Sequence, residues 1–344
     1  MSDPNVLDAA ALAPYLEEQV AGFEGLEEIE KFQTGQSNPT YLISARSGRY
    51  VLRAKPPGTL LKSAHQVDRE FRVMAALGKT GFPVPKVLHL SPEQSPIGRM
   101  FYVMDYIEGR IFWDPALPEA TDNGERSAIY DAMNATLATL HDIDIDKAGL
   151  SDFGRPGSYF ERQYGRWSSQ YRASATDKVE PMERLMAWLA EAQPADDGQV
   201  SLVHGDFRLD NMMFAPDRPV VLAVLDWELS TLGHPLADLA YQCMQWRLPH
   251  SSGFRGLGGV DRAALGIPSE EDYVARYCER RGIGAVDDWS YYLAFSFFRL
   301  AAICQGVYKR ALDGNASNPD KARKYGEAVR LLASLAMKRV DGGK

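Results

Sequence analysis

Two short apolar runs, each followed at once by acidic or amide side chains, constrain this chain more than any other feature. The first run ends at His204 and leads into a polar loop that carries Asp206 and Asn211. The second run ends in Asp226 and Glu228. Short apolar runs bounded by turn residues are typical of buried strands. Carboxylate and amide oxygens are ligands that Mg²⁺ prefers, so the arrangement favours phosphoryl-transfer chemistry over a hairpin with polar turn residues.

Length and composition place the chain among ordinary globular proteins. Its 344 residues suffice for two domains or for one large two-lobed unit. Hydrophobic residues make up 45% of the chain and charged residues 24%, which are common values for a globular protein. The net charge of −8 argues against a nucleic-acid binder, because such a protein needs a basic face.

The sequence shows no sign of export or of membrane insertion. The N-terminus lacks a basic segment followed by an apolar one, so no secretory signal is predicted. No apolar run approaches the roughly 20 residues of a membrane span. Cys243, Cys278 and Cys304 are far apart and odd in number, which indicates buried thiols in a reducing compartment. We therefore expect a cytoplasmic protein without a membrane span.

The spacing after His204 resembles the catalytic loop of kinases, His-x-Asp-x-x-x-x-Asn, which is followed by a metal-binding Asp after a strand. The resemblance implies that Asp206 acts at the attacking hydroxyl group. It further implies that Asn211 and Asp226 bind Mg²⁺. Glu228 is expected to assist the metal, either directly or through water.

Two strand-like segments, 28–32 and 40–44, flank a turn near the N-terminus. Such a turn presents backbone N–H groups that can cover phosphates, although it has fewer glycines than the Gly-x-Gly-x-x-Gly loop of protein kinases. An ordinary hairpin turn is the alternative. The turn residues assigned to nucleotide binding are Gly35, Gln36, Ser37 and Asn38.

A third strand precedes a Pro-Pro-Gly stop, and a helix is expected at about 63–77. Because strand side chains alternate, Arg53 and Lys55 share a face of this strand. Kinases hold the α- and β-phosphates with a Lys at this place and pair it with a Glu of the next helix. The resemblance therefore assigns Arg53 or Lys55 to the phosphates, with Glu70 as the partner. Gly78 is expected to end the helix.

The strand expected at 100–106 runs into an extended, glycine-marked connection. In kinases this linker joins the two lobes and offers backbone groups to adenine. The resemblance assigns the C=O of Asp105 and the N–H of Ile107 to the nucleotide, with Met104 at the back of the pocket. An edge strand followed by a turn is the alternative.

Beyond about residue 124 apolar residues recur at helical spacing. Asp238 stands at the start of one of these segments and is interpreted as a helix cap. We expect an α+β, two-lobed protein-kinase-like fold, with a small antiparallel-sheet N-lobe over 1–106 and a larger, mainly helical C-lobe over 107–344. The helices are expected at 128–142, 236–247, 270–281, 289–311 and 321–339.

His-Gly-Asp at 204–206, in place of His-Arg-Asp, resembles the aminoglycoside phosphotransferase and choline kinase group of small-molecule kinases. Three stretches, 35–41, 52–58 and 225–233, resemble more closely the kinase-like domain fused to some acyl-CoA dehydrogenases and its stand-alone bacterial relatives. The resemblance extends over almost the whole chain. It implies transfer of the ATP γ-phosphate, with Mg²⁺, to a hydroxyl of a small molecule such as a hydroxylated fatty acid or its CoA ester.

An aromatic- and arginine-rich segment, 158–172, is the candidate acceptor site. Arg162 and Arg166 lie one helical turn apart, a spacing that suits an anionic group such as a carboxylate or a CoA phosphate. Together with Trp227 they form the predicted set of substrate contacts. The alternative is a partly solvated helix with packed aromatic residues.

Three other functions compete with this interpretation. The first is an aminoglycoside-type antibiotic kinase, although a polycationic antibiotic favours a carboxylate-lined pocket. The second is a non-catalytic nucleotide-binding pseudokinase, which Arg53 and the sparse glycine loop favour and the intact catalytic loop opposes. The third is a protein kinase, which the short interval between Asp226 and the next helix disfavours. The sequence leaves the oligomeric state open.

Overall fold

The computed structural model describes residues 6–32, 38–58, 65–251, 253–314 and 319–342. The chain forms two compact units, each built from separate segments. The first comprises Met1–Ile111, Asp144–Leu150 and Asn211–Ser230, and the second comprises Phe112–Ile143, Ser151–Asp210 and Thr231–Lys344. The lobe boundary predicted after residue 106 is a functional division and stays a prediction.

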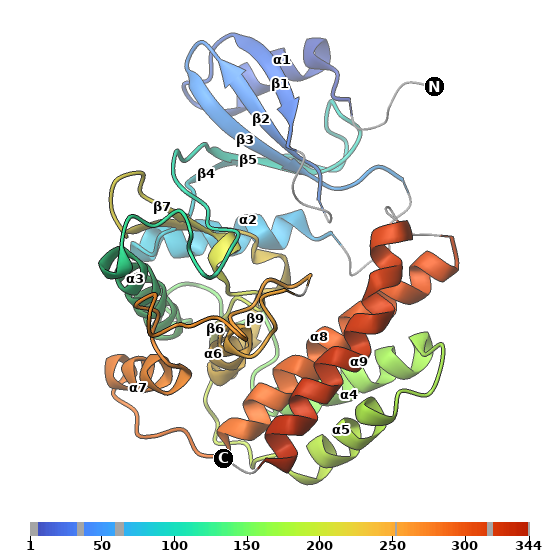
Figure 1. The fold of residues 1–344 in the computed structure, drawn as a ribbon. Helices are drawn as coiled ribbons and strands as arrows, with labels where there is room; N and C mark the ends of the chain where they lie inside the picture. Colours follow the sequence, from blue (N-terminus) through green and yellow to red (C-terminus); the bar gives the residue numbers. More distant parts are fainter. Residues whose placement is uncertain (1–5, 33–37, 59–64, 252, 315–318, 343–344) are drawn as a thin grey trace. The chain divides into compact units, whose positions relative to one another are not determined.

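An antiparallel sheet dominates the first unit (Figure 1). Its strands are β1 (Leu26–Lys31), β2 (Thr40–Ala45), β3 (Gly48–Ala54), β4 (Val87–Leu90) and β5 (Phe101–Asp105), and helix α1 spans Ala9–Gln19. The strand order is β1-β2-β3-β5-β4. Side chains alternate along β2, so that Tyr41, Ile43 and Ala45 enter a core shared with Leu12 and Leu16 of α1. This core fixes the sheet that carries Arg53.

Helix α2 (Val67–Thr80) follows β3 and carries the buried Glu70. It ends at Gly81, whose φ of 80° is a left-handed conformation that favours glycine at a helix C-terminus. The predicted helix end at Gly78 is therefore wrong. Gly78 lies within the helix, because the residue that turns the chain out of the helix is three positions further on.

A hairpin completes the first unit: β7 (Met212–Phe214) pairs antiparallel with β8 (Val221–Val224). The N–H of Val224 donates to the C=O of Pro83 at 2.9 Å, which ties the hairpin to the segment after α2. The short helix η1 (Leu209–Asn211) leads into β7, and η2 (Trp227–Leu229) follows β8. Asp226 thus stands between a strand and a helical turn, as the sequence pattern predicts.

The second unit is mainly helical. Its helices are α3 (Asn123–His141), α4 (Tyr159–Ser174), α5 (Glu180–Glu191), α6 (Leu236–Cys243), η3 (Met244–Trp246), α7 (Glu270–Arg281), α8 (Trp289–Leu312) and α9 (Pro319–Asp341). One short antiparallel pair, β6 (Ser201–Val203) with β9 (Thr231–Gly233), lies among them. Helices α8 and α9 run side by side, and α4 packs on α8 (Figure 1). His204 follows β6 directly, so the first apolar run is also a strand.

The observed elements agree with the predicted α+β class. Each helix expected after residue 124 is present, although α6 ends at Cys243 and continues as the η3 turn. Helix α5 was not predicted. In the part of the chain that the structure describes, no helix combines the length and apolar character that a membrane crossing requires.

Candidate active site

The first unit gathers three carboxylates around the guanidinium of Arg53, on β3. Its Nε lies 2.8 Å from Glu70 Oε2. Its Nη2 donates to Asp226 Oδ1 at 2.7 Å and lies 3.6 Å from Glu228 Oε2. The predicted pairing of Glu70 with a cation of this strand therefore forms with Arg53. We refer to these four residues as the Arg53 cluster.

Lys55 takes no part in the Arg53 cluster. Its Nζ lies 2.5 Å from Glu93 Oε1, in an ion pair whose carboxylate is half exposed. Lys55 stands one residue beyond the end of β3. Of the two cations that the sequence left open, Arg53 is thus the one that contacts Glu70, Asp226 and Glu228.

Glu70 is 1% exposed and accepts two further hydrogen bonds. Asn38 Nδ2 donates to Oε1 at 2.7 Å, and the hydroxyl of Tyr102 donates to Oε2 at 3.1 Å. His65 Nδ1 lies 2.9 Å from Asn38 Oδ1. Asn38 thus acts as a support for Glu70. Gly35, Gln36 and Ser37, the other predicted residues of this turn, lie outside the described residues.

Burial and neighbouring charges act in opposite directions on the pKa values of Arg53 and Glu70. Burial lowers the pKa of Arg53, but the surrounding acidic groups, Glu70 foremost, outweigh it and raise the pKa above its ordinary value. Burial raises the pKa of Glu70, while the charge of Arg53 opposes that rise. The arginine therefore stays charged. One positive charge faces three carboxyl groups, so the cluster has room for a further cation.

Asn211, Asp226 and Glu228 suit Mg²⁺ in the chemistry of their donor atoms. Mg²⁺ takes one or two protein carboxylates and completes its shell with water and substrate phosphates. Among the described residues no group of three or more His, Cys, Asp or Glu side chains could hold a metal by itself. The donor set therefore fits a metal that arrives with a nucleotide. Asp226 adopts the left-handed conformation, φ 64° and ψ 62°, a strained backbone for a residue other than glycine.

The residues predicted to meet adenine lie at the end of β5. Met104 pairs with Val51 of β3, and Asp105 ends the strand, with its N–H donating to Lys86 C=O at 2.9 Å. Ile107 follows two residues later. Their roles in nucleotide binding stay predictions.

The second unit holds Asp206, in the loop after β6. The hydroxyl of Tyr241 donates to Asp206 Oδ1 at 2.6 Å, and the Asp206 N–H donates to His204 Nδ1 at 3.1 Å. Burial, followed by the charge of Asp206, raises the pKa of Tyr241. Tyr241 thus remains a hydroxyl donor that orients the carboxylate. Gly205 has φ 85°, which explains a glycine in the His-Gly-Asp motif.

Asp238 holds the backbone of this loop. It is 1% exposed and accepts the N–H of His204 at 2.6 Å and that of Gly205 at 2.8 Å. Its other contact is His141 Nε2 at 3.4 Å, and His141 Nδ1 lies 2.6 Å from the hydroxyl of Tyr277. The predicted cap role of Asp238 is wrong, because its carboxylate binds a distant loop and does not cap α6. The buried position of an Asp within an apolar helical run is the signal that sequence reasoning underused.

The predicted substrate contacts have different surroundings within their own units. Arg162 donates to the C=O of Arg155 at 2.5 Å, whereas Arg166 is exposed and lies over the ring of Trp167 at 5.1 Å. Trp227 is 1% exposed, and its Nε1–H donates to Val224 C=O at 3.0 Å. The substrate role predicted for Trp227 is therefore corrected: this side chain belongs to the core of the first unit.

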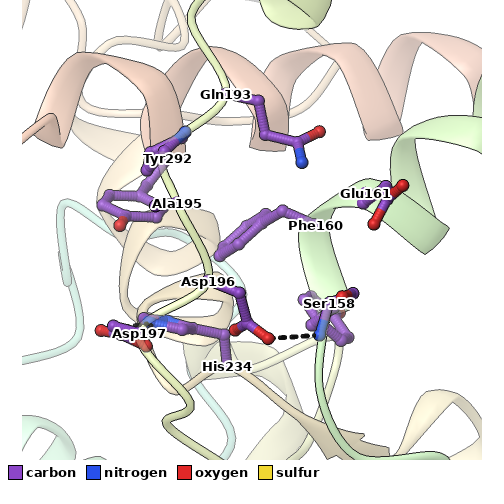
Figure 2. A pocket seen from close by; sticks show the side chains of 11 residues that line it. Ser158, Phe160, Glu161, Gln193, Ala195, Asp196, Asp197, His234 and Tyr292 are labelled. Carbon is purple, nitrogen blue, oxygen red and sulfur yellow. Dashed lines mark hydrogen bonds and ion pairs between the residues drawn. The ribbon is translucent and has the colours of Figure 1, made fainter.

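A pocket of about 280 Å³ opens in the second unit (Figure 2). Its polar groups bind one another: Asp196 accepts the N–H of Ser158 at 2.8 Å, and Asp197 lies 3.2 Å from His234 Nε2. It lies beside the start of β6, at Ser201, whereas Asp206 follows the other end of that strand. The pocket is thus separate from the catalytic loop.

Comparison with known proteins identifies relatives of the whole chain. The model of the APH phosphotransferase enzyme family matches residues 28–276. Acyl-CoA dehydrogenase family member 10 of Mus musculus is 49% identical over 313 residues, which cover 91% of this chain and 29% of that protein. Member 11 of Homo sapiens is 43% identical over 318 residues, which cover 91% and 40%. The chain therefore spans less than half the length of these two curated relatives.

Solved structures share the fold. A Ralstonia eutropha protein named as an aminoglycoside phosphotransferase is 45% identical and superposes with a TM-score of 0.88 over 98% of this chain and 100% of that one. A choline kinase from Cryptosporidium parvum Iowa II is 10% identical, with a TM-score of 0.66 over 97% of this chain and 96% of that one. The predicted kinase-like fold is confirmed. The family match and the first of these structures show that the chain belongs to the APH phosphotransferase enzyme family.

Proposed function

We propose that the protein transfers the γ-phosphate of ATP, with Mg²⁺, to a hydroxyl group of a small acceptor of the hydroxy acid or hydroxyacyl-CoA class. The observation that carries this proposal is the Arg53 cluster, in which three carboxylates from two separate segments surround one guanidinium. A structural ion pair needs only one partner for its cation. A surplus of carboxylates instead suits a place that receives Mg²⁺ together with phosphates.

The first unit binds the nucleotide in this mechanism. Arg53 holds the α- and β-phosphates, and Glu70 fixes the arginine through its ion pair. Asn211 and Asp226 hold Mg²⁺, and Glu228 assists. When bound, Mg²⁺ would supply positive charge that neutralises the charge developing on the phosphates.

The second unit acts on the acceptor. Asp206 orients the attacking hydroxyl and accepts its proton as the new P–O bond forms. Tyr241 keeps the carboxylate in position by its hydrogen bond to Oδ1. The protein forms no covalent intermediate, so positioning and charge neutralisation supply most of the rate enhancement.

The acceptor class rests on the relatives and on charge. The similar proteins of Mus musculus and Homo sapiens are named acyl-CoA dehydrogenase family members. Burial raises the pKa of the Tyr159 hydroxyl, and three arginines oppose that rise through their charge. These are Arg299, Arg162 and Arg166. Positive charge around Tyr159 favours an anionic acceptor over a polycationic antibiotic.

Asp206→Asn tests the proposed chemistry. Loss of the proton acceptor should lower kcat by about 10²- to 10⁴-fold, while the dissociation constant for ATP stays close to that of the wild type. The measurement is ADP release with Mg·ATP and a panel of hydroxy acids, their CoA esters and kanamycin-type compounds. Asp217→Asn, at an exposed carboxylate of the β7–β8 turn, is the matched control. An Asp206→Asn protein with near-native rates, or turnover confined to the antibiotics, would contradict the proposal.

A further inference from the structure

Arg299, on α8, is a buried arginine without an anionic partner. Arg299 is 7% exposed. Among the described residues no carboxylate pairs with its guanidinium and no acceptor is in hydrogen-bond distance. Its contacts are instead with aromatic rings: the guanidinium carbon lies 5.8 Å from the ring centre of Trp167 and 5.6 Å from that of Tyr241.

Other shielded arginines of the second unit are neutralised. Arg247 Nε lies 2.8 Å from Glu270 Oε2, and Arg281 Nε lies 3.1 Å from Asp142 Oδ1. A buried charge without a counter-ion is costly, and aromatic faces compensate only part of that cost. The position of Arg299 therefore calls for an anion that the described side chains do not supply.

The position of Arg299 relative to Asp206 indicates where that anion comes from. Tyr241 joins the two: its ring face meets the guanidinium of Arg299, and its hydroxyl donates to Asp206 Oδ1 at 2.6 Å. The guanidinium of Arg299 and the carboxylate of Asp206 thus contact the same tyrosine side chain, the first at its ring and the second at its hydroxyl group. An acceptor whose hydroxyl reaches Asp206 brings its other end toward Arg299 if the two groups are several carbons apart.

We propose that Arg299 binds the anionic group of the acceptor and makes the enzyme selective for hydroxy acids or their CoA esters over neutral alcohols. This inference rests on the proposed function and adds the residue that reads the charge of the substrate. Rings that cover the face of a guanidinium leave its N–H edges for a carboxylate or a phosphate, which they bind in a bidentate manner. Arg299 changes no bond: the acceptor oxygen gains the phosphoryl group, the β-phosphate oxygen loses it, and Asp206 takes the proton.

The test compares acceptors that differ only in charge. The acceptors are 6-hydroxyhexanoate, its CoA thioester and the neutral 1,6-hexanediol, each at saturating Mg·ATP. Arg299→Gln should lower kcat/KM for 6-hydroxyhexanoate by roughly 10- to 100-fold, mainly through KM, because one charge-assisted hydrogen-bonding group is lost. The values for 1,6-hexanediol should change by no more than about two-fold. Arg299→Lys, which keeps the charge, should fall between Arg299→Gln and the wild type.

Arg172→Gln is the control, because Arg172 is an exposed arginine in the last turn of α4 and is not among the predicted substrate contacts. It should leave both acceptors near wild-type values. A loss with 6-hydroxyhexanoate identifies the carboxylate as the anion, and a loss confined to the thioester identifies the CoA phosphates. Equal losses for acid and diol in Arg299→Gln, or no loss for either charged acceptor, overturn the inference.

Binding of hexanoate, measured by calorimetry without ATP, separates this inference from the proposed function. Hexanoate has the anionic group but no hydroxyl, so it reports on Arg299 alone. Weaker hexanoate binding in Arg299→Gln supports the anion site even if the wild type phosphorylates none of the acceptors, a result that would contradict the proposed function. Wild-type turnover of 6-hydroxyhexanoate that Arg299→Gln leaves unchanged overturns only the role of Arg299.

Discussion

At the scale of single residues, the cation of the Arg53 cluster is an arginine, where kinases use a lysine. A guanidinium presents five N–H donors in a rigid plane, whereas an ammonium is a compact point charge. Arg53 uses this geometry to meet Glu70 with one nitrogen and both Asp226 and Glu228 with another. An arginine can therefore connect α2, β3 and the segment that carries Asp226 and Glu228 at the same time.

We expect Arg53→Gln to weaken ATP binding and to lower kcat together, each by at least about ten-fold, because the phosphates lose their charged contact. Unfolding should also become easier by about 3–5 kcal/mol, since Glu70 stays buried without its cation. Nucleotide titration and urea unfolding measure the two effects. Arg53→Lys should restore part of the stability but less of the activity, because lysine cannot span all three carboxylates.

Lys55→Gln is the control for this prediction. Its ion pair with Glu93 is partly exposed, and such pairs contribute little to stability. Lys55→Gln should therefore stay within about 1 kcal/mol of the wild type and keep its affinity for ATP. If Lys55→Gln impaired ATP binding more than Arg53→Gln, the assignment of the phosphate-binding cation would be reversed.

At the scale of elements, the loop after β6 depends on α6. Asp238 accepts two backbone N–H groups of the loop, and Tyr241, one turn further along α6, donates to Asp206. One helix thus holds both the backbone of this loop and the side chain of Asp206, the proposed proton acceptor. The loop needs this support because its own strand, β6, is only three residues long.

Asp238→Asn should loosen the loop and lower the stability by roughly 2–4 kcal/mol, because an amide cannot accept both backbone N–H groups as a charged carboxylate does. The same variant should lower kcat more than it changes KM for ATP, since the proposed nucleotide contacts lie in the first unit. Asp144→Asn is the control: Asp144 also accepts two backbone N–H groups, from Asp146 and Lys147, but is exposed. Equal losses of kcat in the two variants would contradict the role of Asp238.

Sequence periodicity and motif spacing predicted the sheet, most helices and the acidic strand ends. These features are local, because each depends on residues a few positions apart. The pairing of Lys55 with Glu93 and of Asp238 with the loop joins residues 38 and 33 to 34 positions apart, which no local pattern encodes. Helix α2 ends at Gly81 because this glycine adopts a positive φ. The sequence does not show whether Gly78 or Gly81 takes that conformation.

The proposed substrate residues were the least predictable part of the candidate site. Helical spacing favoured Arg162 and Arg166, but spacing does not say which face of a helix is buried. Arg299 had a signal of another kind: it interrupts an apolar run, Phe297-Phe298 before it and Leu300-Ala301 after it. A charged residue in a buried run is a candidate for function because charge is rarely buried without a partner.

At the scale of the whole molecule, buried histidines make stability depend on pH. Burial lowers the pKa of both His141 and His234 below the ordinary value of 6.5. The unfolded chain therefore binds protons below about pH 6.5 that the folded chain excludes. As the pH is lowered below this value, the free energy of unfolding decreases by up to about 1.4 kcal/mol per pH unit for each histidine. Hydrogen bonds from His141 and the loop overcome burial and lower the pKa of Asp238 below 3.8, so its contribution is lost only at more acidic pH.

Urea unfolding between pH 8 and pH 5 measures this dependence. The wild type should lose stability as the pH drops below 6.5, and His234→Gln should show a flatter profile by about one proton. A wild-type stability that does not change over this range would refute the prediction.

Because the chain crosses several times between its compact units, its gene can be recombined only in certain ways. The chain passes from one unit to the other after Ile111, Ile143, Leu150, Asp210 and Ser230. A gene segment that encoded only one unit would have to be assembled from separate pieces, so recombination can move this enzyme only as an undivided block. The relatives fit that expectation: 91% of this chain recurs within 29% of the Mus musculus protein. Gene fusion can join such a block to other domains, but it cannot separate the two units from each other.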